Sequence, residues 1–326
     1  MVDPKDNNEK NKELVEALKT EYDDEEVVAE SKSNNVFGFK LKKVLIVLIL
    51  IVILLIIVLW LLSVDSSKTT NSNKGKLLYN ELISQNNIVT NDAGLYQVNN
   101  QYVFRGETVN NYVKFSNRIW RIVKIDSNND IVLILDNYFS FMHNWDDRYN
   151  ENTNYNSGYN EYSKSRIKDF FNDMYNDSLN SKESNKNVLL TKSSVKKIVD
   201  YNLCVDKASV NQELKNNYGC SVTLNNVKIG LLTLSDYINA SLDSSCKNSD
   251  SRSCQNYNYL AKKSGSWWLA TANSENNTDV YMVASRGRIF TSKASRIAYI
   301  RPVIHLSKNI KYTSGNGTEN KPYVIE

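Results

Sequence analysis

Residues Val44–Leu62 read VLIVLILIVILLIIVLWLL and contain no charged side chain, no glycine and no proline. As a helix, these 19 residues would extend ~28 Å, close to the ~30 Å hydrocarbon core of a bilayer. A buried helix of a soluble domain would need some polar face, and this stretch has none. The stretch therefore predicts a membrane-spanning helix over Val44–Leu62, with the lipid bilayer as its partner.

A cleaved signal peptide is the main alternative for this stretch. Such a peptide has a short basic start, an apolar run of about 7–15 residues and a small-residue cleavage site. Here 43 residues precede a longer run, and the SVDS sequence after it is a poor cleavage site. Lys40, Lys42 and Lys43 crowd the N-terminal end of the run, whereas Asp65 is the first charge after it. We therefore expect an uncleaved single-pass protein of the cell membrane, with a cytoplasmic N-terminus and an extracellular C-terminal domain.

The sequence on either side of the apolar run differs in composition. Residues 1–43 carry 8 lysines and 11 acidic residues, a net charge of −3, and are predicted to be a disordered cytoplasmic tail. Residues 44–62 are the predicted transmembrane helix, 63–75 a polar stalk, and 76–326 an extracellular domain. Since the whole chain has a net charge of +4, the rest carries +7. That charge is too mild to indicate nucleic acid, but it is compatible with an anionic cell-wall polymer.

The predicted extracellular domain mixes two periodicities. Short apolar and alternating stretches between residues 95 and 135 predict a β-meander, with a turn at residues 127–130. Ile167, Phe170, Phe171 and Met174 recur at helical spacing within a predicted helix over Ser163–Leu179. Strand patterns return in the C-terminal third. Helices between two β-rich regions indicate an α+β fold.

All four cysteines follow the apolar run, on the side predicted to be oxidising. An even number there indicates two disulfides, for which three connectivities exist. We favour Cys204–Cys220 with Cys246–Cys254, because each pair would close a short, polar, turn-rich loop. The sequence has no C-x-x-C, and neither histidine lies at ligand spacing from a cysteine. No metal is therefore expected, and the lack of a glycine-rich phosphate loop gives no reason to expect a cofactor.

Several short motifs follow one another through the predicted domain. They are Tyr162-Ser163 with Ile167 and Phe171-Asn172, then GLLTLSDY at Gly230–Tyr237, then SWWLAT at Ser266–Thr271, with Gly287 and IRPVI at Ile300–Ile304.

In this order the motifs resemble an uncharacterised family of extracellular domains from Firmicutes and related bacteria. Its signature is W-W-L-x-[ST], a glycine turn and an [IV]-R-P strand. The resemblance covers roughly residues 94–310, and the family looks distantly similar to the C-type-lectin-like fold, including formylglycine-generating-enzyme-type domains. It implies a compact, ligand-displaying scaffold and no particular activity. The calcium-lectin loops are not matched, since Asn144-Trp145-Asp146 has the wrong order.

Catalytic chemistry has few candidates in this sequence. His143 and His305 are the only histidines, so a triad would need one of them. His305 lies in an apolar strand and is interpreted as structural, whereas His143 has no nearby cysteine or G-x-S-x-G motif. Asp146 and Asp147 are adjacent, so their side chains point in different directions. The sequence assigns no catalytic residue and leaves enzymatic activity undecided, with a non-enzyme favoured.

A binding surface is the better-supported prediction. The long loop from Tyr138 to Tyr159 places Phe141, Trp145 and Tyr149 among polar residues, a composition typical of adaptable binding surfaces. Trp267, Trp268 and Arg301 are the second candidate set, although each set could instead pack into the core.

The predicted function is non-catalytic binding of a protein or glycan at a bacterial cell surface. The partner would be a cell-wall polymer or a surface protein. The alternatives are a cell-wall-processing enzyme and a structural module of an envelope complex.

Overall fold

The chain divides into two units, residues 1–72 and 73–326, each of which is considered by itself. The computed structural model describes residues 47–58, 75–84, 87–139, 141–181, 188–211, 220–243, 258–262 and 264–326. In the first unit the described part is a single helix over residues 47–58.

The predicted membrane-spanning helix is corrected by this structure. The described part of the predicted span is a helix over residues 47–58. Among the described residues, no helix is long and apolar enough to cross a membrane. The ends of the predicted span, residues 44–46 and 59–62, lie outside the described residues, as do the predicted tail and nearly all of the stalk.

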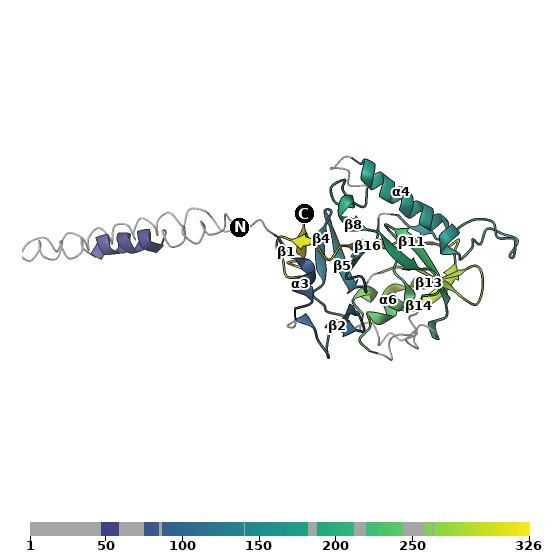
Figure 1. The fold of residues 1–326 in the computed structure, drawn as a ribbon, viewed down its shortest axis with the longest axis horizontal. Helices are drawn as coiled ribbons and strands as arrows, with labels where there is room; N and C mark the ends of the chain where they lie inside the picture. The colour runs from purple at the N-terminus through teal and green to yellow at the C-terminus, as the bar shows by residue number, and fades with distance from the viewer. Residues whose placement is uncertain are drawn as a thin grey trace, which may run out of the picture. The chain divides into compact units, whose positions relative to one another are not determined.

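The longest strand of the largest sheet in the second unit is β5 (Arg118–Ile125) (Figure 1). The strand order of this sheet is β18 (Tyr323–Ile325), β4 (Tyr112–Phe115), β5, β6 (Ile131–Leu135), β16 (Val303–Leu306) and β8 (Ile198–Val199), with the hairpin of β2 (Gly94–Val98) and β3 (Gln101–Arg105) attached to β5. All pairings are antiparallel except β18 with β4. Every residue of β6 is buried, as its continuous IVLIL run requires of a strand covered on both faces.

A smaller four-stranded sheet lies beside this one. It consists of β10 (Lys207–Ala208), β12 (Trp267–Asn273), β13 (Asp279–Val283) and β14 (Ile289–Lys293), in that order. All seven residues of β12 are buried, so this strand is the centre of the second part of the core.

Three short strand pairs connect the sheets and loops. They are β9 (Tyr201–Cys204) with β11 (Thr223–Val227), β7 (His143–Asn144) with β15 (Ile297–Ala298), and β1 (Lys76–Leu77) with β17 (Lys311–Tyr312). The last pair ties the start of the second unit to its C-terminal region.

Helices cover the sheets from outside. The longest is α4 (Arg166–Asn180), which runs along the surface of the unit (Figure 1). The Ser165 side chain caps it by accepting a hydrogen bond from the Lys168 backbone N–H. Its apolar stripe buries Ile167, Phe171 and Met174, so the helical periodicity of the sequence is realised. The described residues also form α3 (Leu78–Leu82), α6 (Leu234–Asn239) and the 3-10 turns η2 (Tyr162–Lys164), η3 (Val195–Lys197), η6 (Tyr259–Lys262) and η7 (Ser285–Gly287).

The second unit is thus a mixed α+β structure that is mostly sheet. One hydrophobic core runs through it and includes Trp120, Trp145, Trp267 and Trp268. The predicted fold class was wrong in including a membrane-spanning helix.

Candidate functional site

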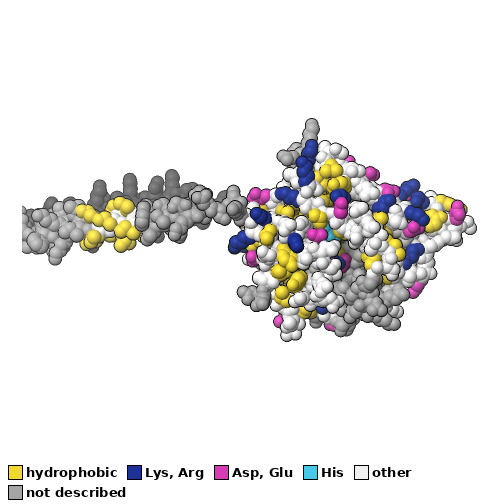
Figure 2. Space-filling view, in the orientation of Figure 1, with side chains coloured by type: hydrophobic (Ala, Val, Ile, Leu, Met, Phe, Trp, Pro, Cys, Tyr) yellow, Lys and Arg dark blue, Asp and Glu magenta, His cyan; other side chains and the backbone are white. Residues whose placement is uncertain are grey.

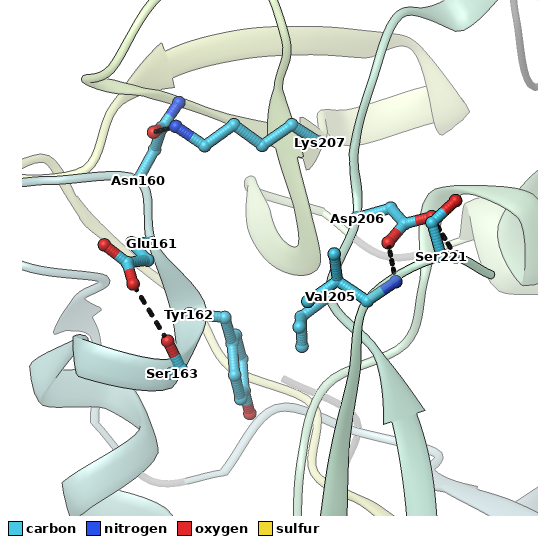
Figure 3. Close-up of a pocket in the computed structure, with 9 residues that line it drawn as sticks. Asn160, Glu161, Tyr162, Ser163, Val205, Asp206, Lys207 and Ser221 are labelled. Carbon is cyan, nitrogen blue, oxygen red and sulfur yellow. Dashed lines mark hydrogen bonds between the residues drawn. The ribbon is translucent and has the colours of Figure 1, made fainter.

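A pocket among the described residues lies between the η2 segment and the β9–β10 connection (Figure 3). Its volume is about 430 Å³, within the usual range for small-ligand sites. Three short segments line it: residues 160–163, 205–207 and 221–222.

Asn160 holds the first wall of the pocket in place. Its side chain is buried, and its Nδ2 group lies 2.9–3.1 Å from the carbonyl oxygens of Asn273, Asn276 and Asp279, to which it donates. These carbonyls belong to the end of β12, the following turn and the start of β13, so the wall is anchored to the smaller sheet. Asn160 Oδ1 accepts a 2.6 Å hydrogen bond from Lys207 Nζ, which reaches across from the second wall (Figure 3).

A disulfide and a carboxylate hold the second wall together. Cys204 and Cys220 form the predicted disulfide, with their Cα atoms 5.7 Å apart. The Asp206 carboxylate accepts hydrogen bonds from the backbone N–H groups of Ser221 and Val222. The β9–β10 connection is therefore fixed to the residues that lead into β11. The other predicted pair, Cys246–Cys254, lies outside the described residues.

The pocket contains charges of both signs. Glu161 pairs with Lys164 at 3.0 Å and accepts a hydrogen bond from Ser163 Oγ. The bond from Lys164 is the main reason why the pKa of Glu161 lies below its usual value. Asp206 stands on the opposite side of the pocket from Glu161 (Figure 3). The lining thus contains two carboxylates, an ammonium and two serine hydroxyls.

An apolar base completes the pocket. The Tyr162 ring is buried, and Val205 faces it from the second wall (Figure 3). Burial also raises the pKa of the Tyr162 phenol above its usual value. A ligand that fits this site combines hydrogen-bonding groups with a small apolar face.

Four of the six residues predicted to bind a ligand lie in the core. Trp145, Trp267, Trp268 and Arg301 are each at most 1% exposed. Their polar atoms are used internally: Trp145 Nε1 donates to the Leu269 carbonyl at 3.2 Å, and Trp268 Nε1 donates to the His143 carbonyl at 2.8 Å. The structure therefore does not present these side chains to a ligand.

The Arg301 side chain links segments that are far apart in the sequence. Its guanidinium donates to the carbonyl oxygens of Leu135, Leu260 and Asp136 at 3.0–3.3 Å and lies 4.9 Å from the centre of the Trp267 ring. Burial lowers the pKa of Arg301 to about 10. The structure thus places Trp267 and Arg301, two of the predicted binding residues, in contact with each other, but this contact lies within the core.

The other two predicted residues are at the surface. Phe141 is 72% exposed and Tyr149 is 54% exposed. The aromatic loop is therefore divided, because Phe139 and Trp145 of the same loop are buried. Neither Phe141 nor Tyr149 lines the pocket. Figure 2 shows hydrophobic side chains in several separate patches on the visible face, so exposure of an aromatic ring does not by itself mark a site.

Reasoning from sequence missed the pocket residues. Asn160, Glu161, Asp206 and Lys207 are ordinary polar residues in polar segments. The one usable signal was the position of Asp206 and Lys207 directly after Cys204, since a disulfide often fixes a surface loop.

No family model, curated protein or solved structure matches this chain. The resemblance to the bacterial extracellular family and to C-type-lectin-like folds therefore stays a prediction.

Proposed function

We propose that the second unit is a non-catalytic binding domain that takes a polar ligand, a glycan or a peptide segment, in the pocket between residues 160–163, 205–207 and 221–222. The observation that supports this proposal most directly is that hydrogen bonds and a disulfide hold both walls of the pocket in place. Asn160 anchors one wall to the smaller sheet, a disulfide closes the other, and the Lys207–Asn160 hydrogen bond joins them. A site fixed in this way loses little conformational entropy on binding.

The chemistry of the lining favours a ligand rich in hydroxyl or amide groups. Lys207 can donate hydrogen bonds, Glu161 can accept them, and Val205 with Val222 offers a small aliphatic contact. Glycans and extended peptides combine such polar edges with apolar faces. The Cys204–Cys220 disulfide supports action in an oxidising compartment outside the cytoplasm. A cell-wall polymer or a surface protein is the partner that fits both features.

A cell-wall-processing enzyme is the second candidate, because Glu161 and Asp206 stand across the pocket from each other (Figure 3). Glycoside hydrolysis uses such a carboxylate pair, with one member kept protonated by a raised pKa. Here the pKa of Glu161 is lowered by Lys164, and Asp206 is occupied by two backbone N–H groups. Both observations favour binding over catalysis.

The test measures retention of the full chain on purified cell-wall glycan and on immobilised surface protein. Val222→Asp places a charge on the apolar side of the pocket, and Lys207→Met removes the ammonium group with little change in size. Lys207→Met should weaken retention by at least about tenfold, since one lost charge-assisted hydrogen bond costs roughly 1.5–3 kcal/mol. Val222→Asp should weaken retention as well, because the ligand would then bring an apolar face against a charge. Lys321→Met, at an exposed position outside the pocket, is the matched control and should bind like the wild type.

The same panel separates binding from catalysis. Glu161→Gln should leave the glycan uncleaved in every sample, as the wild type does. Release of soluble fragments by the wild type and its loss in Glu161→Gln would establish the enzyme instead. Equal retention of all variants would rule out this pocket as the binding site.

A further inference from the structure

A second cluster of polar side chains lies away from the pocket, where the β5–β6 turn meets strand β16. Asp126 and Asp130 are at the two ends of that turn, and His305 is in the middle of β16. One ligand atom from each residue lies within 4.8 Å of the other two. The backbone pairing of His305 with Val132 of β6 brings these residues together although they are far apart in the sequence.

The buried imidazole of His305 lies against the Asp126 carboxylate without a hydrogen bond of good geometry. The residue is 6% exposed, and its Nδ1 atom has no hydrogen-bond partner among the described residues. Asp126 Oδ2 is only 3.3 Å from Nδ1, but the two atoms do not meet hydrogen-bond geometry. A buried polar atom without a well-formed hydrogen bond is destabilising. The arrangement therefore points to a further group between the histidine and the carboxylates.

The histidine ring is held rigidly in its orientation. The Tyr201 ring stacks on it with the two ring centres 3.8 Å apart and the planes 1° from parallel. Strand β16 is itself paired on both sides, with β6 and with β8. The stacked Tyr201 ring therefore limits rotation of the imidazole.

The turn also fixes one carboxylate. Asp126 Oδ1 accepts hydrogen bonds from the backbone N–H groups of Asn128 and Asp130, both at 2.9 Å. This leaves Oδ2 on the side that faces His305. Support of a carboxylate through one oxygen, with the other free, is how metal-binding carboxylates are commonly oriented.

We propose that Asp126, Asp130 and His305 bind a divalent transition metal ion of the zinc class, with water completing its coordination. Ligand atoms ~2.0–2.1 Å from a tetrahedral zinc ion are roughly 3.3 Å apart, which is the Nδ1–Oδ2 separation found here. An imidazole together with two carboxylates suits zinc, manganese or cobalt better than calcium, which prefers all-oxygen sites. The ion would tie the β5–β6 turn to β16.

The cluster of Asp126, Asp130 and His305 could not be predicted from the sequence. Neither the spacing of Asp126 and Asp130 nor the distant His305 matches a known metal motif, and only the strand register makes them neighbours.

Isothermal titration of the chelator-treated full chain with Zn²⁺ tests the proposal, with the visible absorption of Co²⁺ as a second readout. The wild type should take up one ion per chain. His305→Gln should weaken binding at least about 100-fold and remove the Co²⁺ band, and Asp130→Asn should weaken it at least about tenfold. His143→Gln, at the other histidine, is the matched control and should bind like the wild type.

Asp130→Asn keeps the test valid if His305→Gln fails to fold, because it preserves the size of a partly exposed side chain. No metal uptake by the wild type, or unchanged uptake in Asp130→Asn, would overturn the proposal and leave a simple histidine–carboxylate pair.

Discussion

Replacement of Trp145 by alanine should lower the free energy of unfolding of the second unit strongly, although the residue lies in a long polar loop. The side chain is completely buried. Its ring meets the Tyr162 ring edge-on with centres 5.6 Å apart, and its Nε1 donates to the Leu269 carbonyl of β12. Trp145 thus fastens the loop to the smaller sheet and supports the base of the pocket.

The size of the effect follows from this burial. A buried tryptophan removes about 150–250 Å² from water, which at ~25 cal/mol per Å² corresponds to about 4–6 kcal/mol. That bookkeeping is an upper estimate, because the unfolded chain already buries some surface. We therefore expect the free energy of unfolding to fall by about 3–5 kcal/mol, the usual range for large-to-small changes of buried aromatic residues.

Phe141→Ala is the matched control within the same loop. Since Phe141 is 72% exposed, its replacement should change the free energy of unfolding by less than about 1 kcal/mol. Urea unfolding followed by tyrosine and tryptophan fluorescence measures both variants under the same conditions. A loss of under 1 kcal/mol for Trp145→Ala, or equal losses for the two variants, would refute the division of the loop into a buried and an exposed part.

Three further predictions concern the disulfide, the buried arginine and alkaline pH. Cys204→Ser combined with Cys220→Ser should lower the free energy of unfolding by about 3 kcal/mol, since the bridge spans 16 residues; equal urea midpoints would contradict this. Arg301→Met should cost several kcal/mol in the same assay, because three buried carbonyl oxygens lose their donor; near-wild-type stability would show that these hydrogen bonds are dispensable. Burial raises the pKa of Tyr323 to about 12 and also raises that of Tyr237. The folded state therefore keeps protons that the unfolded state releases above pH ~10, and stability should fall from there. Arg301, whose pKa is lowered to about 10, opposes this fall, but it is a single group. A melting temperature that rises with alkaline pH, measured by circular dichroism, would contradict the predicted loss of stability.

Local patterns predicted local structure well. The apolar spacing around Phe171 gave α4, the IVLIL run gave the fully buried strand β6, and the short spacing of Cys204 and Cys220 gave their disulfide. Each of these depends on neighbours in the sequence, which is why the sequence reveals them. The apolar run at Val44–Leu62 was the exception, because no helix among the described residues is long and apolar enough to cross a membrane.

The candidate site depended on contacts between distant segments, which periodicity does not encode. Trp145 and Phe141 look alike in the sequence, yet one reaches the Leu269 carbonyl and the other points into solvent. Lys207 becomes a pocket residue only because Asn160, far from it in the chain, is anchored to the β12–β13 turn. A polar residue in a polar loop carries no mark of such a role.

The most direct test of the proposed binding site is amide hydrogen exchange of the full chain, with and without purified cell-wall glycan. We predict that the glycan slows amide exchange in the wild type at residues 160–163, 205–207 and 221–222. In Lys207→Met, adding the glycan should leave the exchange rates at these residues unchanged. Protection confined to the loop around Phe141 and Tyr149, with the pocket segments unaffected, would place the ligand elsewhere and contradict the proposal.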